Sequence, residues 1–151
     1  MLNAWFDGST LTHRSIEQID LGVAVDTSDG LFVPVLRDIA NRSEKHLRKG
    51  LNALRKDVKA RTIPPQELQR ATITLSNFGT IAGKFASPIV VPPQVAIIGA
   101  GVIREQPVAH KGSCAIHTIL PLSLSFDHRC ITGGEAARFL KALIEDLQKK
   151  K

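Results

Sequence analysis

Residues 120–134 have the sequence LPLSLSFDHRCITGG, which organises the C-terminal part of the chain. The first half of this stretch alternates between apolar and small polar residues, a pattern typical of a strand with one buried face. A histidine between two charged residues follows at once, and Gly133-Gly134 indicates a turn. We predict that the strand begins at Cys114, as the longest strand of the chain, with a bend at Pro121.

Two amphipathic helices are predicted from the spacing of apolar residues. The first follows Ser43, a suitable N-cap, and Pro64-Pro65 ends it. Because Gly50 in its middle costs about 1 kcal/mol relative to alanine, this helix must depend on packing. The second begins at about Gly134. Their apolar positions are Leu47, Leu51, Leu54 and Val58 in the first, and Ala137, Leu140, Ile144 and Leu147 in the second.

Four more segments have strand patterns. Residues 19–26 and 31–36 flank a Ser-Asp-Gly turn signal and are predicted to form a hairpin. Residues 71–78 have a period of two, and the continuous apolar run at 94–102 suits a central strand that is buried on both faces. The sequence therefore predicts a single domain of the α+β class, with a mixed β-sheet and flanking helices.

The composition narrows the possible functions. The 151 residues include 20 basic and 14 acidic side chains, a net charge of +6. Much of this charge is predicted on helical faces without interleaved aromatic residues, which weighs against nucleic acid as a partner. No run approaches the roughly 20 apolar residues of a membrane span, and no secretory signal is visible. Two cysteines are too few for a disulfide scaffold, so a reducing compartment is expected, by default the cytoplasm.

His128 is the strongest candidate for chemistry, because it follows a strand end and imidazole titrates near neutral pH. For an isolated histidine, a surface residue without a catalytic role is the alternative. A catalytic triad with Ser76, Ser123 or Ser125 is disfavoured, because the chain lacks a Gly-x-Ser-x-Gly elbow. Asp127 is also badly placed to orient the ring of the histidine next to it.

A metal site and a dinucleotide site are disfavoured as well. Cys114, His117, His128 and Cys130 are potential zinc ligands, but positions i and i+3 of a strand point to opposite faces. Structural cysteines are the preferred interpretation. The Gly-Ala-Gly at 99–101 lacks the third glycine and the helix of a dinucleotide fingerprint. We therefore expect no metal.

Four collinear motifs carry a resemblance to a known family. In chain order, the motifs are residues 21–25 with 30–35, residues 72–79, residues 88–99, and residues 120–129 with Gly133 and 136–139. Their order and spacing resemble the catalytic domain of dihydrolipoamide acyltransferases, the core components of 2-oxo acid dehydrogenase complexes. The resemblance runs from about residue 3 to residue 147 and implies a chloramphenicol-acetyltransferase-like fold. Residues 1–151 are then expected to be the C-terminal two-thirds of the catalytic domain, with the lipoyl and peripheral-subunit-binding domains absent.

The resemblance also implies a reaction and its residues. The family transfers an acyl group from the thiol of dihydrolipoamide to coenzyme A. Because a thiol of pKa near 8.5 is only a few per cent ionised at neutral pH, a base is needed, and His128 would be that base. Ser76 matches the serine that stabilises the oxyanion, an effect of about 3 kcal/mol. Asn77, beside it, is the candidate contact for coenzyme A.

Position 132 departs from the family pattern. An aspartate or asparagine usually stands four residues after the catalytic histidine and supports the active-site loop, whereas this chain has Thr132. Its hydroxyl is expected either to substitute for that residue or to leave the activity reduced. A non-catalytic core scaffold is therefore one alternative, which restoring aspartate at position 132 would test. A free-standing chloramphenicol-type acetyltransferase is disfavoured by the motifs at 21–35 and 88–99.

The resemblance implies partners too. Acetyl is the expected acyl group, with branched-chain and succinyl transfer as alternatives. His128 and Ser76 would meet between neighbouring subunits of a homotrimer, and trimers would build a cubic or dodecahedral core. The other partners would be lipoyl domains and the dehydrogenase and dihydrolipoamide dehydrogenase components, in a bacterial-type cytoplasm or a mitochondrial matrix. Neither nucleic acid nor a membrane is expected.

Overall fold

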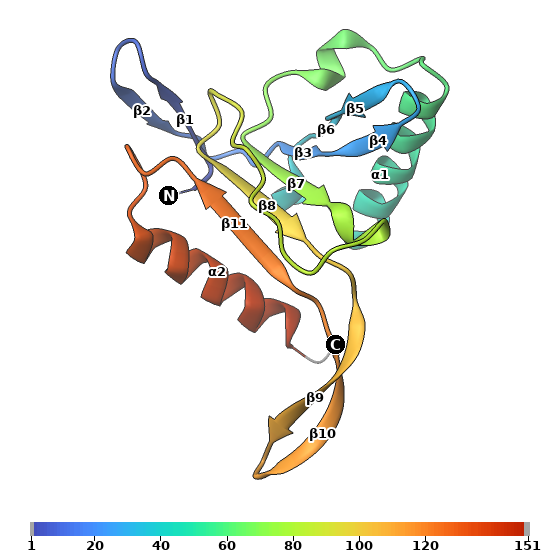
Figure 1. Cartoon of the computed structure of the whole chain (residues 1–151). Helices are drawn as coiled ribbons and strands as arrows, with labels where there is room; N and C mark the ends of the chain where they lie inside the picture. Colours follow the sequence, from blue (N-terminus) through green and yellow to red (C-terminus); the bar gives the residue numbers. More distant parts are fainter. Residues whose placement is uncertain (1, 150–151) are drawn as a thin grey trace.

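The computed structural model describes residues 2–149 and is built around one mixed sheet (Figure 1). Its five strands lie in the order β11-β8-β7-β3-β6. Their bounds are Leu21–Val23 for β3, Val35–Leu36 for β6, Ile73–Asn77 for β7, Ala96–Ala100 for β8 and Leu122–Phe126 for β11. Strand β7 is parallel to both β3 and β8, whereas β6 and β11 pair antiparallel at the two edges. The predicted α+β fold is confirmed.

The hairpin predicted from residues 19–26 and 31–36 is confirmed, although each arm is divided into two short strands. β3 pairs with β6, and β4 (Val25–Thr27) pairs with β5 (Gly30–Phe32). Pro34 lies between β5 and β6, where its carbonyl accepts a hydrogen bond of 2.8 Å from the backbone of Val23. The missing N–H of proline explains why the arm is interrupted there.

The helix predicted after Ser43 is also confirmed, as α1 (Glu44–Lys59), which packs against β6 and β4. The Ser43 hydroxyl accepts a hydrogen bond of 3.4 Å from the backbone of His46, and Val58 is buried. A Cβ at Gly50 would lie 2.8 Å from the side chain of Leu36, so glycine allows the helix to approach β6 closely. The helix ends at Lys59, before the proline pair that was predicted to end it: Arg61 has a left-handed backbone with φ of 57°, and the backbone of Thr62 donates a hydrogen bond of 2.9 Å to the Asp57 carbonyl. Pro64-Pro65 lies beyond this end, and a 3-10 turn, Pro65–Leu68, follows.

The single strand predicted for residues 114–126 is wrong, because the structure divides it between two sheets. β10 (Ser113–Ile119) pairs with β9 (Arg104–His110), which was not predicted, while β11 joins the main sheet. The division falls at the predicted bend, where Pro121 cannot donate a ladder bond and its carbonyl accepts one of 2.9 Å from Gly101. The β9–β10 hairpin projects from the body of the molecule (Figure 1).

The C-terminal helix is confirmed as α2 (Gly133–Leu147), but the predicted apolar face is displaced by one residue. Ala136 is buried and Phe139 half-buried, whereas Ala137 is exposed and Ile144 is 39% exposed. Apolar residues cover so much of α2 that their spacing did not determine which line of them faces the sheet. An unpredicted hairpin, β1 (Ala4–Asp7) and β2 (Thr12–Ser15), precedes the sheet.

The main core lies among β1, the sheet and the start of α2. Its buried members are Leu2, Ala4, Phe6, Ile73, Val95, Ala96, Ile131 and Ala136. Among the described residues, no helix has both the length and the apolar character that crossing a membrane requires.

Candidate active site

His128 stands on a short loop that connects β11 to α2. The loop is fixed at both ends: the backbone of Asp127 donates a hydrogen bond of 2.8 Å to Val95, and Ile131, only 1% exposed, is inserted into the core. The His128 side chain is exposed, and its ring centroid lies 5.5 Å from that of Phe126. A rigid loop therefore presents the imidazole on the surface of the chain.

An ion pair within the loop leaves the histidine independent of its neighbouring carboxylate. Arg129 donates hydrogen bonds of 3.0 and 2.6 Å to the two carboxylate oxygens of Asp127, and its guanidinium lies 4.7 Å from the centroid of the Phe6 ring. The Arg129 side chain holds the pKa of Asp127 below its ordinary value. Because Arg129 occupies this carboxylate, the arrangement does not form the Ser-His-Asp triad considered above.

Thr132 begins α2 rather than contacting the histidine. Its hydroxyl donates to the Glu135 carboxylate at 2.7 Å and lies 3.3 Å from the backbone N–H of Glu135, while the Thr132 backbone donates to the same carboxylate at 2.9 Å. This reciprocal arrangement is a capping box. The hydrogen bonds from the backbone and hydroxyl of Thr132 lower the pKa of Glu135. Thr132 thus fixes where the helix starts and where the histidine loop ends; its part in catalysis stays a prediction.

Ser76 lies in the second half of β7, half-buried, on one wall of a groove of about 750 Å³. The other walls come from β5 and from the proline-rich segment before β8. At the base of the groove, Thr74 and Gln94 are joined by a side-chain hydrogen bond of 2.6 Å. The residues of the proline-rich wall are Pro88, Ile89, Val91, Pro92 and Pro93. Sequence reasoning did not predict this wall, because only the fold brings that segment to β7.

Asn77 ends β7 with its side chain exposed, and its carbonyl accepts a hydrogen bond of 3.2 Å from Thr80. It is not among the residues that line the groove. Its contact with coenzyme A stays a prediction.

The sheet separates Ser76 from His128 within one chain. Ser76 is level with Gly99 and Ser123 across β8 and β11, whereas His128 lies beyond Phe126 at the other end of β11. With strands about 4.8 Å apart and a rise of about 3.3 Å per residue, the two side chains are roughly 15 Å or more apart. One copy of the chain therefore does not place both groups on the same substrate atom.

The candidate zinc ligands also lie on separate elements. Cys114 is exposed on β10, whereas Cys130 belongs to the histidine loop, where its thiol lies 3.5 Å from the Asp127 carbonyl and burial raises its pKa. Within residues 2–149, no three histidine, cysteine or acidic side chains are grouped as a metal site would require. His117, three residues after Cys114 on β10, instead lies beside His110, with the ring centroids 4.9 Å apart and the ring planes tilted by 53°.

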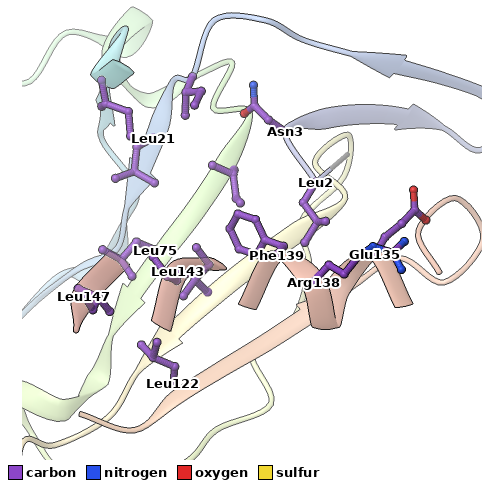
Figure 2. Close-up of a pocket in the computed structure, with 14 residues that line it drawn as sticks. Leu2, Asn3, Leu21, Leu75, Leu122, Glu135, Arg138, Phe139, Leu143 and Leu147 are labelled. Atoms are coloured by element: carbon purple, nitrogen blue, oxygen red, sulfur yellow. The ribbon is translucent and has the colours of Figure 1, made fainter. Parts of the chain in front are cut away.

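A second, more apolar cavity of about 700 Å³ lies between α2 and the sheet. Figure 2 shows Phe139 and Leu143 on the side of α2 that faces Leu75 of β7. Glu135 and Arg138 bring charge to one end of it. The sequence predicted an apolar face on α2 but gave no signal that this face would be incompletely filled.

The sheet order and the position of the histidine after an edge strand define a fold class. The fold is that of chloramphenicol acetyltransferase, to which the chain is similar with a TM-score of 0.61 and 14% identity, over 98% of this chain and 69% of that one. The family model for 2-oxoacid dehydrogenases acyltransferase (catalytic domain) matches residues 1–151. The chain belongs to this family, which confirms the resemblance described above.

Two relatives illustrate the range within the family. The chain is 40% identical over 148 residues to the succinyltransferase component of the 2-oxoglutarate dehydrogenase complex of Azotobacter vinelandii, covering 96% of this chain and 37% of that protein. It is 33% identical over 132 residues to the acetyltransferase component of the pyruvate dehydrogenase complex of Mycoplasma pneumoniae, covering 87% and 33%. The chain thus spans about a third of the length of these curated relatives.

Two solved structures are similar over almost the whole chain. One is the cubic core of the pyruvate dehydrogenase multienzyme complex, with a TM-score of 0.92 and 36% identity over 97% of this chain and 60% of that one. The other, with the same values, is the A. vinelandii dihydrolipoamide acetyltransferase, whose catalytic mechanism was investigated for the role of a serine, a histidine and an asparagine.

Proposed function

We propose that the chain carries the acyl-transfer chemistry of a 2-oxo acid dehydrogenase complex, moving an acyl group from dihydrolipoamide to coenzyme A. One observation carries this proposal. In the A. vinelandii acetyltransferase, the investigated serine precedes the histidine by 52 residues and the asparagine follows it by four; Ser76 and Thr132 have these same separations from His128. Family membership, established over residues 1–151, supports the transfer of these roles.

The chemistry needs a base and an oxyanion donor. The imidazole of His128 removes the proton from the thiol of coenzyme A, and the resulting thiolate attacks the thioester carbonyl carbon. The carbonyl oxygen becomes negatively charged, and the Ser76 hydroxyl donates a hydrogen bond to it. When the C–S bond to dihydrolipoamide breaks, the leaving thiolate takes the proton back from the imidazolium. Over the whole reaction one C–S bond forms and one breaks, the proton passes from one thiol to the other, and no metal or redox step is involved.

The separation of the two groups supports an active site between subunits. Since one chain holds Ser76 and His128 roughly 15 Å or more apart, the serine of one copy would act with the histidine of another. The projecting β9–β10 hairpin supports assembly as well, because an isolated two-stranded hairpin is marginally stable and Ile116 on it is 72% exposed. We infer a homotrimer as the unit of a larger core, by analogy with the solved cubic core.

The acyl group that we propose is acetyl. Most side chains that line the groove beside Ser76 are apolar. Among the described residues that line it, Arg70 is the one that is charged, and it precedes β7 and so lies towards the opposite end of that strand. Burying the free carboxylate of a succinyl group there without a partner would be unfavourable. Succinyl transfer is the second candidate, favoured by the A. vinelandii succinyltransferase relative. Turnover rates with acetyl-coenzyme A and succinyl-coenzyme A discriminate between the two.

Replacing His128 tests the base assignment. We expect His128→Ala to lower kcat for transfer to coenzyme A by at least about 100-fold, the scale of general-base catalysis. His46→Ala, which removes an exposed histidine from α1, is the matched control and should retain full activity. Retained turnover in His128→Ala would contradict the assignment.

Co-assembly of two inactive variants tests the placement between subunits. Ser76→Ala and His128→Ala subunits are mixed under conditions that allow exchange. If each site takes its serine and histidine from different copies, about one quarter of the sites regain both groups in an equal mixture, since symmetry makes every contact alike. If both groups came from one copy, no activity would return, and the arrangement proposed here would be wrong.

A further inference from the structure

The whole excess of positive charge lies in one short segment. Residues 42–61 contain eight basic and two acidic residues, a net charge of +6. This equals the net charge of the entire chain, so the remaining 131 residues are electrically balanced. Almost all of the segment is α1, which lies along the outside of the molecule next to β4 and β6 (Figure 1).

The cations of α1 form one continuous stripe. At 100° per residue, six side chains fall within an arc of about 120° opposite the apolar face and extend over roughly 20 Å of the helix. Both acidic residues of the segment, Glu44 and Asp57, lie outside this arc. The members of the stripe, called the α1 stripe below, are Lys45, Arg48, Lys49, Arg55, Lys56 and Lys59. All six are exposed, and within residues 2–149 none of them forms an ion pair.

An ordinary solvated helix face mixes charges of both signs, and the α1 stripe does not. Lys45 is separated by three residues from Arg48 and by four from Lys49, and Lys59 has the same spacings to Lys56 and Arg55. Like charges at these spacings destabilise a helix. The stripe therefore costs folding stability, and an anionic partner would remove that cost.

The α1 stripe adjoins the wall of the Ser76 groove. Just after the helix, the Nε of Arg61 donates a hydrogen bond of 2.9 Å to the carboxylate of Asp29, in the turn between β4 and β5. Leu31 and Phe32 of β5 line the groove that contains Ser76. A partner bound along α1 would thus lie beside the β4–β5 hairpin and the groove behind it.

The surroundings of the stripe favour a protein as the partner. A membrane is disfavoured because the apolar face of α1 packs on the sheet and cannot insert. Single-stranded nucleic acid is disfavoured because the α1 stripe consists of lysine and arginine alone, and α1 has no phenylalanine, tyrosine or tryptophan on which successive bases could stack. The names of the relatives state that their substrate is a dihydrolipoyllysine residue, so in those enzymes the acyl donor is part of a protein.

We propose that the α1 stripe docks an acidic face of the protein that carries the acyl-dihydrolipoyl group, next to the groove that receives this group. The inference rests on the proposed function, since it assumes a protein-borne donor. The electrostatic contact would accelerate encounter with the donor without contributing to the chemical step, because surface charges act mainly on association.

Kinetics with two forms of the donor test the docking. The probe is a lipoylated domain of net negative charge from the A. vinelandii 2-oxoglutarate dehydrogenase complex, compared with free dihydrolipoamide. The stripe variant is Lys45→Glu/Lys49→Glu/Lys56→Glu. The control is Arg14→Glu/Lys141→Glu/Lys149→Glu, which makes the same change in charge at exposed positions on β2, on α2 and just after α2.

In the stripe variant we expect the KM for the lipoylated domain to rise about tenfold or more at 25 mM salt, with kcat unchanged. The effect should shrink at 300 mM salt, where charges are screened within a few ångströms. The KM values for free dihydrolipoamide and for coenzyme A should stay unchanged, and the control should behave as wild type. An equal rise in the KM for free dihydrolipoamide or for coenzyme A would overturn the proposal, and so would an equal rise in the KM for the domain in the control variant. Tighter binding of a 20-nucleotide RNA than of the lipoylated domain would overturn it as well.

A binding measurement separates this proposal from the proposed function. If the unmodified chain fails to turn over free dihydrolipoamide, the proposed function fails. Fluorescence anisotropy of the labelled lipoylated domain, which requires no turnover, then still decides the docking. Loss of binding in the stripe variant but not in the control supports it, and equal binding in both overturns it.

Discussion

Substitutions at Thr132 separate the structural role of this residue from a catalytic one. In Thr132→Ala, the hydroxyl that bonds the Glu135 backbone and carboxylate is lost. The capping box then keeps only the hydrogen bond from the backbone of residue 132 to Glu135, which needs no side chain. Because Thr132 is exposed, its removal creates no cavity, and the loss of the cap is the main effect.

We expect Thr132→Ala to lower the free energy of unfolding by about 1 kcal/mol, the usual cost of replacing an N-cap threonine. For a chain of this length, that corresponds to a fall in Tm of roughly 2–4 °C. Thr132→Asn and Thr132→Asp place good capping residues at the same position, so their stability should stay within about 0.5 kcal/mol of the wild type.

The assay is urea unfolding of the four proteins, followed by acyl-transfer measurements on each. Because the folded-state pKa of Glu135 lies below its ordinary value of 4.5, its contribution is present above pH 4.5 and is lost as the pH falls through the lowered pKa. The difference between wild type and Thr132→Ala should therefore narrow under acid conditions.

Equal stability of Thr132→Ala and wild type would refute the capping argument. A large gain in turnover by Thr132→Asp, with unchanged stability, would instead support the view that the threonine has left the chain a non-catalytic scaffold.

Three further results are expected. A Cβ at Gly79 would overlap the backbone carbonyl of Gly101, so Gly79→Ala should destabilise the fold by about 1–3 kcal/mol. Gly133 has open space around it, so Gly133→Ala should not destabilise the fold. Thermal unfolding of both variants checks this. Ile131→Ala should lower the free energy of unfolding in urea by about 2–5 kcal/mol, because the Ile131 side chain is buried in the core. It should also lower kcat, because this side chain holds the histidine loop in place. A folded variant with the kcat of the wild type would contradict the effect on catalysis. Because the pKa of Asp127 is lowered in the folded state, its ionised carboxylate stabilises the fold at pH values above 3.8, and this stabilisation is lost as the pH falls through the lowered pKa. The free energy of unfolding of Asp127→Asn should therefore depend less on pH in acid than that of the wild type. Parallel pH profiles of unfolding for the two proteins would exclude this role.

Local patterns in the sequence predicted most of the elements and their class. Helix α1 has a capping serine and a single apolar line, and both signals agree with the structure. The run at residues 94–102 predicted a central strand, and β8 does lie between β7 and β11. These features depend on neighbours in the chain, so the sequence contains the information directly.

Other features arise only from contacts between distant segments. The break at Pro121 was predicted as a bend, but whether the two halves share a sheet depends on which partners lie beside them. The face of α2 shifted by one residue because Phe139 and Leu143, rather than Ile144, meet the sheet. Periodicity alone does not distinguish two adjacent lines on a helix that is apolar over so wide an arc.

The chemical groups of the candidate site, His128, Ser76 and Thr132, are predicted from the chain alone, because their identities and separations are properties of the chain. How these groups are arranged in space depends on the fold. Parallel pairing of β7 with β8, and antiparallel pairing of β8 with β11, place the serine and the histidine at opposite ends of the sheet. Which strands lie side by side, and in which direction, depends on the packing of segments that are far apart in the chain, and the local pattern of residues does not specify that choice.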